Sequence, residues 1–406
     1  MRTRGGSPSA WVLSRNGVRD VHIVGVSQTP VNRDPQVRTR QLAATAVRDA
    51  LAHSTLPKSR VGALFVGNMT GGILEQQLQL GSLIADYAGL AGIDAVNIEA
   101  ACASGAAAAR MAYMTIAGGM HDVVIVCGFE RMMHVEKEAV TQALATAADW
   151  ELESSRGESF LSLNAKLMRA YMDEYSVEPE DFAPFSINAH RNALENPNAV
   201  FHKAIGVTEY LESRIVVDPI RLYDVSPVCN GAAAVVLASD KVAAELRNGA
   251  AEVVIAASAA ATAPVALTRR TNVLHLQAVQ TATEDALSRA KITRSDIDLF
   301  ELHDAYTIMS VLALESAGFA KPGTALDFGK EGRITLEGDL PVSTMGGLKA
   351  RGHPVGATGV YQLVEAYLQL SGQAGANQVR DAEVALVQNV GGTAATVVNH
   401  VLRRVA

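Results

Sequence analysis

Residues 48–68 read RDALAHSTLPKSRVGALFVGN, and residues 284–304 read EDALSRAKITRSDIDLFELHD. The two stretches align without a gap, and each is typical of a helix followed by a short turn and an apolar strand. We expect the strand to end at Gly67 in the first copy and at His303 in the second. Strand-like apolar runs alternate with helical patterns along the chain, which indicates an α/β protein with an internal repeat.

A second pair of segments extends the repeat. CASGAAAARMAYMTIAGG, which begins at Cys102, has the same layout as HPVGATGVYQLVEAYLQLSG, which begins at His353. Each is a loop, then a helix poor in charge, then a buried strand. A surface helix shows a polar face, whereas the helix after Cys102 carries one charge, Arg110, so we predict that it is buried on nearly all sides. Two such helices packed against each other bring Cys102 and His353 to a shared centre.

The chain divides into segments of different composition. Residues 1–20 hold four arginines and one acidic residue and are predicted to form a flexible tail. The first repeat occupies 21–248 and the second 249–406. Within the first, about 129–224 is richer in charge, Met and aromatic residues, and an insertion of this size favours a lid or a substrate-binding element.

Bulk composition excludes several classes of protein. The 406 residues carry a net charge of −7 and no long basic run, which argues against a nucleic-acid partner. No apolar run reaches the ~20 residues of a membrane-spanning helix. Three widely spaced cysteines argue against a disulfide framework and for a reducing, cytoplasmic location. No histidine or cysteine cluster has metal-ligand spacing, so no metal site is predicted.

Cys102 and His353 are the strongest candidates for chemistry. The N-terminal amides and the dipole of the helix after Cys102 would lower the pKa of its thiol and bind an oxyanion. His353 lies in the glycine-rich loop STMGGLKARGHPVGATG and is placed to take the thiol proton. His303, at a matching position of the repeat, is assigned an electrophilic role. Cys127 and Cys229 are interpreted as structural residues.

Several motifs in chain order resemble those of the thiolase family: ACASG, SPVCNGAAAVVLAS, HDAYT, GGLKARGHPVGATG and QNVGGTAATVV. The resemblance spans almost the whole chain and is nearest to the archaeal and sterol-carrier-protein-type branch. It implies a duplicated five-layer αβαβα fold with an inserted loop domain. It also implies a homodimer or a dimer of dimers.

The resemblance also implies roles for individual residues. Cys102 matches the nucleophile that becomes acylated, and His353 matches the histidine that activates it. His303 falls where the family has an Asn or His that polarises a thioester oxygen. Gly391 matches a glycine whose backbone N–H completes the oxyanion hole, and Ser226 matches a serine near the pantetheine arm of coenzyme A.

One departure from the family pattern concerns the second catalytic thiol. The common thiolases have a cysteine where this chain has Asn389, and the sterol-carrier-protein type often supplies one where this chain has Ala305. We therefore expect another group to serve as the acid or base at the substrate α-carbon. His303 is the first candidate and Tyr306 the second.

Three functional hypotheses follow. The first is a coenzyme A-dependent acyltransferase of the acetyl-CoA C-acyltransferase or 3-ketoacyl-CoA thiolase type, with an acyl-cysteine intermediate and no permanently bound cofactor. The second is a decarboxylating β-ketoacyl synthase-like enzyme that uses the Cys-His-His set alone. The third is a thiolase-like subunit that works with a small zinc-ribbon/OB-fold partner on a specialised acyl group, for example an aromatic or branched one.

Overall fold

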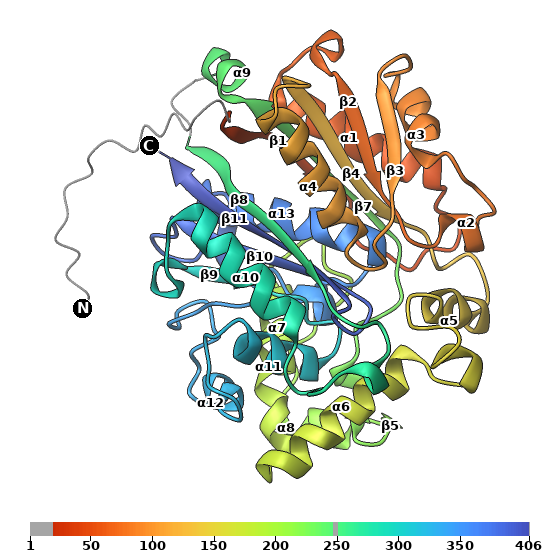
Figure 1. Ribbon diagram of the computed structural model, residues 1–406, viewed down its shortest axis with the longest axis vertical. Coiled ribbons are helices and arrows are strands. Elements are labelled where there is room, and N and C mark those ends of the chain that lie inside the picture. The colour runs from red at the N-terminus through yellow and green to blue at the C-terminus, as the bar shows by residue number, and fades with distance from the viewer. Residues whose placement is uncertain (1–18, 247–250, 406) are drawn as a thin grey trace, which may run out of the picture.

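The computed structural model describes residues 19–246 and 251–405. Nine strands form one twisted sheet in the order β3-β2-β4-β7-β1-β8-β11-β10-β9 (Figure 1). The strands are β1 (Val21–Gln28), β2 (Ala63–Gly67), β3 (Asp94–Ile98), β4 (Val123–Glu130), β7 (Gly231–Ser239), β8 (Glu252–Thr262), β9 (Leu299–Glu301), β10 (Val384–Gly391) and β11 (Thr396–Val405). A separate hairpin consists of β5 (Ile215–Val217) and β6 (Ile220–Arg221).

The strand order confirms the internal repeat. In the first half the order β2-β4-β7-β1 matches β9-β10-β11-β8 in the second, and a short antiparallel contact between β1 and β8 joins the halves. The two aligned stretches adopt the same structure, a helix, a 3₁₀ turn and a strand. In each, the residue directly after the helix has a left-handed conformation: Thr55 after α1 (Thr39–Ser54) and Lys291 after α10 (Gln277–Ala290). The expected end of the second strand was wrong, because β9 stops at Glu301, two residues before His303.

Helices and sheet halves form five layers. In β4, Ile125 packs outward with α1 and α3 (Leu80–Ala88), whereas Val126 packs inward. In β10, Val387 packs inward into the same central core, and Leu386 packs outward with α10 and α11 (Thr307–Ser316). The central layer consists of α4 (Ser104–Ala117) and α13 (Thr358–Leu370). Because β4 and β10 lie between two helical layers, both are buried at every position and both are mostly apolar.

The two central helices touch through glycines. A Cβ atom placed on Gly359 would lie 2.4 Å from the backbone nitrogen of Ala106, and one on Gly105 would lie 2.8 Å from the carbonyl oxygen of Gly356. The predicted packing of these helices is therefore confirmed. The prediction that α4 is buried on nearly all sides was wrong, because the side chains of Met111 and Met114 are about two-fifths exposed, at 42% and 41%.

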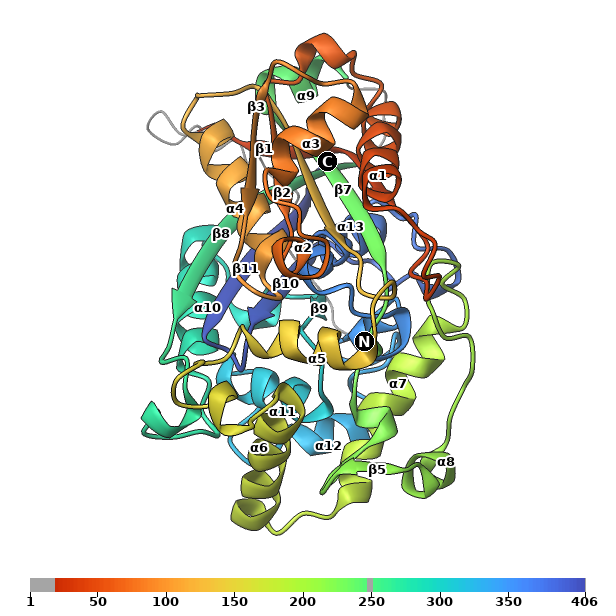
Figure 2. The same ribbon diagram turned by 90° about the vertical axis from the view of Figure 1, so that its right-hand side faces the viewer.

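The segment between β4 and β7 forms an elaborate insertion, which gathers at one end of the molecule (Figure 2). Its helices are α5 (Lys137–Ala145), α6 (Phe160–Tyr175), α7 (Ala183–Ala193) and α8 (Val207–Glu212), and the β5–β6 hairpin follows them. Outside the insertion, the described residues also form the short helices α2 (Gly71–Leu74), α9 (Asp240–Glu245) and α12 (Ala325–Lys330). The division into domains at 129–224 stays a prediction.

Two of the predicted segment boundaries involve residues that the structure does not describe. Residues 1–18 of the predicted tail lie there, and so do residues 247–250, where the boundary between the halves was expected. Arg19, the first described residue, is not part of a free tail, because its side chain donates hydrogen bonds to the carbonyls of Ile116 and His121. Within 19–246 and 251–405, no helix combines the length and apolar character that crossing a bilayer requires.

Candidate active site

A cavity of about 810 Å³ contains the three residues assigned to chemistry, Cys102, His303 and His353. Most of its remaining wall is apolar and comes from the insertion, including Met132, Val140, Leu144, Phe160, Leu161 and Ile205. Five cationic side chains also line it: Arg33, Lys137, Lys203 and Arg214, which are exposed, and Lys349, which is buried. No carboxylate of the described residues lies on this wall, so the cavity suits a ligand with an apolar part and a negatively charged part.

Cys102 lies in a tight loop two residues before α4 begins. Ala101 adopts a left-handed conformation with φ 53°, which is uncommon for a residue with a side chain. The Ser104 hydroxyl stabilises this turn because it accepts a hydrogen bond from the Ala100 N–H at 2.9 Å and donates one to the Ala101 carbonyl at 2.6 Å. The small residues around Cys102 therefore allow a sharp turn that presents the sulfur to the cavity.

The expectation that the pKa of Cys102 is lowered was wrong. Burial raises the pKa of this thiol to about 12, and the nearby Glu130 carboxylate adds to the increase. The backbone N–H groups of Gly392 and of Cys102 itself point at the sulfur and oppose this increase, because they stabilise the thiolate. The resting residue is thus a thiol, and a base must remove its proton before it can attack.

His353 follows a glycine-rich loop that tertiary contacts hold in place. Gly352 has φ 117°, and a Cβ there would lie 2.6 Å from Val31 Cγ1 and 3.2 Å from the sulfur of Cys229. The Nδ1 atom of His353 lies 2.7 Å from the Thr358 hydroxyl. Burial lowers the pKa of His353 well below its usual value, and the positive charge of Arg351 adds to this. The imidazole is therefore neutral and able to accept a proton.

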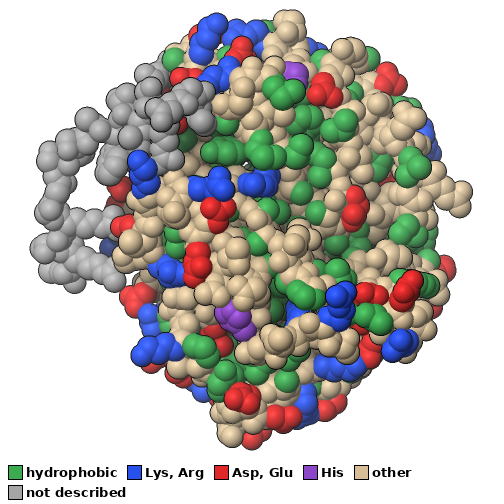
Figure 3. Space-filling model, in the orientation of Figure 1, with side chains coloured by type: hydrophobic (Ala, Val, Ile, Leu, Met, Phe, Trp, Pro, Cys, Tyr) green, Lys and Arg blue, Asp and Glu red, His purple; other side chains and the backbone are tan. Residues whose placement is uncertain are grey.

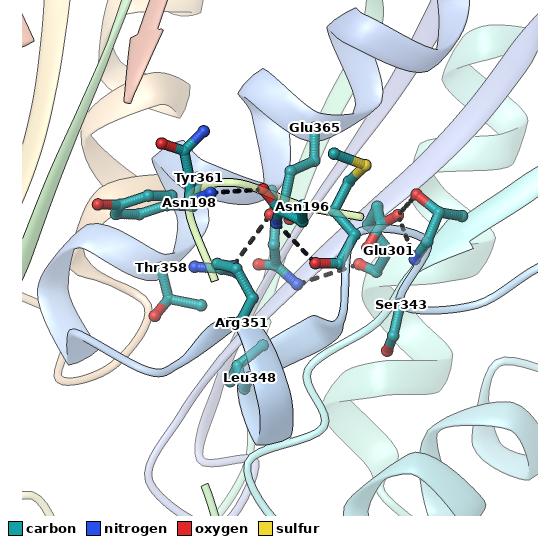
Figure 4. A network of polar contacts seen from close by, with 12 residues as sticks. Asn196, Asn198, Glu301, Ser343, Leu348, Arg351, Thr358, Tyr361 and Glu365 are labelled. Atoms are coloured by element: carbon teal, nitrogen blue, oxygen red, sulfur yellow. Dashed lines mark hydrogen bonds and ion pairs between the residues drawn. The ribbon is translucent and has the colours of Figure 1, made fainter. Parts of the chain in front are cut away.

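Beneath this loop lies a fully buried polar network (Figure 4). The π-helical turn Gly347–Arg351 places the Arg351 guanidinium 3.0 Å from the Glu365 carboxylate and 4.7 Å from the centre of the Tyr361 ring. Lys349 lies 3.6 Å from Asp304. Breaking a buried ion pair of this kind typically costs about 3–5 kcal/mol, so the network holds the loop that carries His353 firmly against α13.

His303 approaches the same point from the other side of the cavity. The sulfur of Cys102 and one ring nitrogen of each of His303 and His353 all lie within 4.8 Å of one another. The two imidazole rings meet edge to face, with centres 5.0 Å apart. The Nδ1 atom of His303 lies 3.0 Å from the side-chain nitrogen of Asn389. Burial lowers the pKa of His303 to about 3, so this ring is also neutral.

The remaining predicted residues occupy different places. Ser226 and Tyr306 line the cavity, and Tyr306 is close enough to Cys102 for the sulfur to raise its pKa further, beyond the effect of burial. Gly391 lies at the end of β10, where a Cβ would approach the Ala100 carbonyl to 2.5 Å. Gly392, which follows it, is the glycine that lines the cavity and directs its N–H at the sulfur of Cys102.

Cys127 and Cys229 are buried, as expected of structural residues, and burial raises the pKa of both thiols to about 12. The Cys229 sulfur accepts a hydrogen bond from the backbone N–H of His353. Cys102, His303 and His353 also form the one group of His, Cys, Asp and Glu side chains in 19–246 and 251–405 close enough to share a metal ion.

Sequence reasoning missed Glu130, which joins the two loops of the site. Its carboxylate accepts hydrogen bonds from the Thr70 hydroxyl and from the backbone N–H groups of Met69, Thr70 and Gly356, at 2.6–3.0 Å. Gly356 follows His353 by three residues, so Glu130 ties the first half to the histidine loop of the second. The signal was a lone acidic residue at the end of an apolar strand, which is costly to bury unless it is well bonded.

Comparisons with known proteins agree with this architecture. The thiolase N-terminal domain model matches residues 21–241, and the thiolase C-terminal domain-like model matches 259–404. The chain is 41% identical to the acetyl-CoA acetyltransferase of Methanothermobacter thermautotrophicus, over 95% of this chain and 100% of that protein. It is 30% identical to the benzoylsuccinyl-CoA thiolase subunit BbsB of Thauera aromatica, over 92% of this chain and 95% of that subunit.

A solved structure shares the fold at low identity. The chain superposes on the Ltp2-ChsH2(DUF35) aldolase with a TM-score of 0.83 and 21% identity, covering 95% of this chain and 98% of that one. The two family models together span both halves of the repeat, and the duplicated five-layer architecture predicted from the sequence is confirmed. The chain belongs to the thiolase family of acyltransferases.

Proposed function

We propose that this enzyme makes or cleaves a carbon–carbon bond next to a thioester, with Cys102 as the residue that carries the acyl group. The observation that supports this most directly is the meeting of one thiol and two neutral imidazoles within 4.8 Å on the wall of an apolar cavity. A thiol beside a neutral histidine is the arrangement of an activated cysteine nucleophile.

The acylation step needs few groups. A neutral His353 accepts the thiol proton at Nε2 as the sulfur of Cys102 attacks the thioester carbonyl. The N–H groups of Gly392 and Cys102 already point at the sulfur and are placed to stabilise the oxyanion beside it. We assign this role to the N–H of Gly392, whereas the role of the Gly391 N–H, which the family resemblance implies, stays a prediction. His353 then gives the proton to the departing thiolate of coenzyme A.

The cavity supports a coenzyme A thioester as substrate. Its apolar wall suits an acyl group and the pantetheine arm, for which Ser226 offers a hydroxyl, and the four exposed cationic side chains suit the phosphates. No group in this scheme needs a permanently bound cofactor or metal. Among the relatives, an acetyl-CoA acetyltransferase supports an acetyl donor.

We further propose a cytoplasmic homodimer that serves lipid metabolism. The edge strand β3 is largely exposed, with Val96 at 45%, and Met111 and Met114 of α4 lie exposed as well. Hydrophobic side chains gather on this face over α4 and β3 (Figure 3). An unpaired, partly apolar strand edge is the kind of surface that a second copy covers. A monomer at micromolar concentration in sedimentation experiments would contradict the homodimer.

A second candidate function is that of one subunit in a larger enzyme. The structural neighbour is a complex with a DUF35 protein, and the 30% identical relative from Thauera aromatica is a subunit of a thiolase for an aromatic substrate. Both support a small zinc-ribbon/OB-fold partner and a specialised acyl group. If so, acyl transfer to Cys102 proceeds without the partner, whereas carbon–carbon chemistry requires it.

The test is acylation of the isolated chain by a panel of acyl-CoAs, followed by intact-mass measurement and peptide mapping. We expect an adduct on Cys102 that Cys102→Ala abolishes, with unfolding by urea unchanged. Cys127→Ala is the matched control, because it removes a thiol buried in β4 away from the cavity. An adduct on Cys127 or Cys229, or one that persists in Cys102→Ala, overturns the proposal.

A further inference from the structure

The environment of Asn389 points to a role for the residue that occupies the place of the missing second thiol. Asn389 is fully buried on β10, and its side-chain nitrogen lies 3.0 Å from Nδ1 of His303. Its side-chain oxygen lies against α13, where a Cβ on Gly359 would be only 2.4 Å away, and has no hydrogen-bond partner. The opposite orientation of the amide would bury an unpaired NH₂ group there instead, which is the rarer and costlier situation in proteins.

The internal repeat explains why these two side chains meet. In the first half, Gly67 and Gly128 are direct partners in the parallel β2–β4 ladder. In the second half, β9 and β10 pair in the same way through Glu301 and Val387. His303 and Asn389 lie two residues beyond that pair, at the positions that correspond to Gly67 and Gly128; Asn389 is on β10, and His303 is in the loop that follows β9. The register of β9 against β10 therefore brings the loop that carries His303 next to Asn389.

We propose that Asn389 holds His303 in the Nε2–H tautomer, so that His303 only donates a hydrogen bond and His353 is the base in both half-reactions. Because the amide N–H donates to Nδ1, the single proton of a neutral His303 ring must lie on Nε2. This inference rests on the proposed function. His303 then donates to the thioester oxygen of the second substrate and has no lone pair free to take an α-proton.

His353 has the complementary arrangement. The Thr358 hydroxyl lies 2.7 Å from Nδ1 of His353 and 3.5 Å from the Pro354 carbonyl, which can only accept. We assign the hydroxyl as donor to Pro354 and as acceptor from Nδ1–H, which leaves the lone pair of His353 on Nε2. No hydrogen bond to Nε2 of either ring occurs within 19–246 and 251–405, so both nitrogens are open to the cavity.

The proton count closes with this one base. After acylation, the former thiol proton has left with coenzyme A and His353 is neutral. His353 Nε2 removes the α-proton of the second thioester, and the C–H electron pair forms an enolate whose oxygen accepts from His303 Nε2–H. The enolate carbon attacks the acyl carbonyl, the C–S bond to Cys102 breaks, and the thiolate takes the proton back from His353. No second thiol is required.

The tautomer is measured directly by ¹⁵N NMR of histidine-labelled protein, with the His303 signals assigned from the spectrum of His303→Asn. We expect Nε2 of His303 to be protonated and Nδ1 unprotonated at neutral pH. A protonated Nδ1 overturns the proposal. This readout does not depend on catalysis, so it remains informative if Cys102 does not acylate and the proposed function fails.

Kinetics of Asn389→Asp provide the second test, because the variant keeps the size of the side chain but accepts from Nδ1–H. The neutral His303 ring would then carry its lone pair on Nε2 and lose its donor. We expect Cys102 to acylate within a few-fold of the normal rate, while the carbon–carbon step falls about 10²-fold. The lost rate should partly return at lower pH, where the imidazolium again donates from Nε2.

Asn389→Leu, of similar size, removes the amide without supplying an acceptor and controls for loss of packing. Since its His303 keeps access to both tautomers, we expect a smaller loss without recovery in acid. Equal losses in the two variants, with the same pH profile, would make Asn389 a packing residue and overturn the proposal.

Discussion

The two halves of the repeat use the same backbone positions for different purposes. In the first half, Gly67 and Gly128 have no side chains, and a Cβ on either would collide with the start of a central helix, at 2.6 Å from Gly105 and 2.8 Å from Ala357. In the second half, the corresponding positions carry His303 and Asn389, which form part of the cavity site. In the first half these positions allow the backbone to pack closely against the central helices. In the second half they carry polar side chains.

The same asymmetry recurs elsewhere in the fold. By strand register, Val235 of β7 corresponds to His400 of β11, and both are fully buried. At the sheet edges, β3 is largely exposed, whereas β9 is buried and bonded to the 341–342 segment. The first half thus supplies the nucleophile, Glu130 and an open edge, and the second half supplies the two imidazoles and Asn389. In a duplicated fold, a given position can serve close packing in one copy while the corresponding position in the other copy carries a side chain of the active site.

The largest effect is expected for His303→Ala. Loss of a preorganised donor should slow the carbon–carbon step by about 10²–10³-fold while sparing acylation of Cys102 by a simple thioester. Single-turnover acylation by intact mass and product formation by chromatography measure the two steps separately. His303→Asn, which retains an N–H donor, should keep part of the activity. Equal loss of both steps would mean that His303 merely holds the site together, like its counterpart Gly67.

A change at that counterpart should affect stability rather than one chemical step. In Gly67→Ala the new Cβ would meet the backbone of Ser104 and Gly105, which cannot yield as a flexible side chain would. We expect the free energy of unfolding in urea to fall by about 1–3 kcal/mol. Gly72→Ala is the control, because its Cβ would touch only the end of the exposed Leu78 side chain at 3.1 Å. Equal stability of both variants would contradict the packing role that we assign to Gly67.

The third effect concerns His400 and appears only in acid. Burial lowers the pKa of His400 to about 4, below the roughly 6.5 of an unfolded histidine. Between these values the unfolded chain binds more protons than the folded protein. As the pH decreases from about 6.5 to about 4, the free energy of unfolding therefore decreases by about 1.4 kcal/mol per pH unit for this residue. His400→Val, which copies Val235 of the first half, should flatten the pH dependence by that amount.

His202→Val is the control for this measurement, because it also replaces a histidine by valine but at an exposed position. The experiment is urea unfolding of the three proteins at several pH values between about 6.5 and about 4. An unchanged slope in His400→Val would show that the buried imidazole does not titrate differently in the two states.

Much of the scaffold could be predicted from the sequence because the chain repeats itself. The gapless match of residues 48–68 with 284–304 indicated the duplication, and the loop-helix junctions at Cys102 and His353 indicated a shared centre. These features are local, since glycine spacing and the absence of charge are visible without a structure. The same local reading placed His303 in the site even though its strand ends earlier than expected.

The electrostatics of the site could not be predicted in this way. The pKa of Cys102 depends on burial and on Glu130, which lies at the end of β4, and both raise the pKa by more than either backbone N–H group lowers it. The contact of Asn389 with His303 depends on strand register. The exposed face of α4 escaped notice because alanines and methionines carry no charge whether they face solvent or core.

The glycine contact between α4 and α13 has a consequence for how such an enzyme can diverge. The separation of Cys102 and His353 is set by two backbones in direct contact at Gly105 and Gly359. The wall that faces the acyl group comes instead from the insertion, which lies outside that layer. Substitutions in α5 and α6 can therefore accumulate and change which acyl group is accepted, while the spacing of the reacting atoms is inherited unchanged.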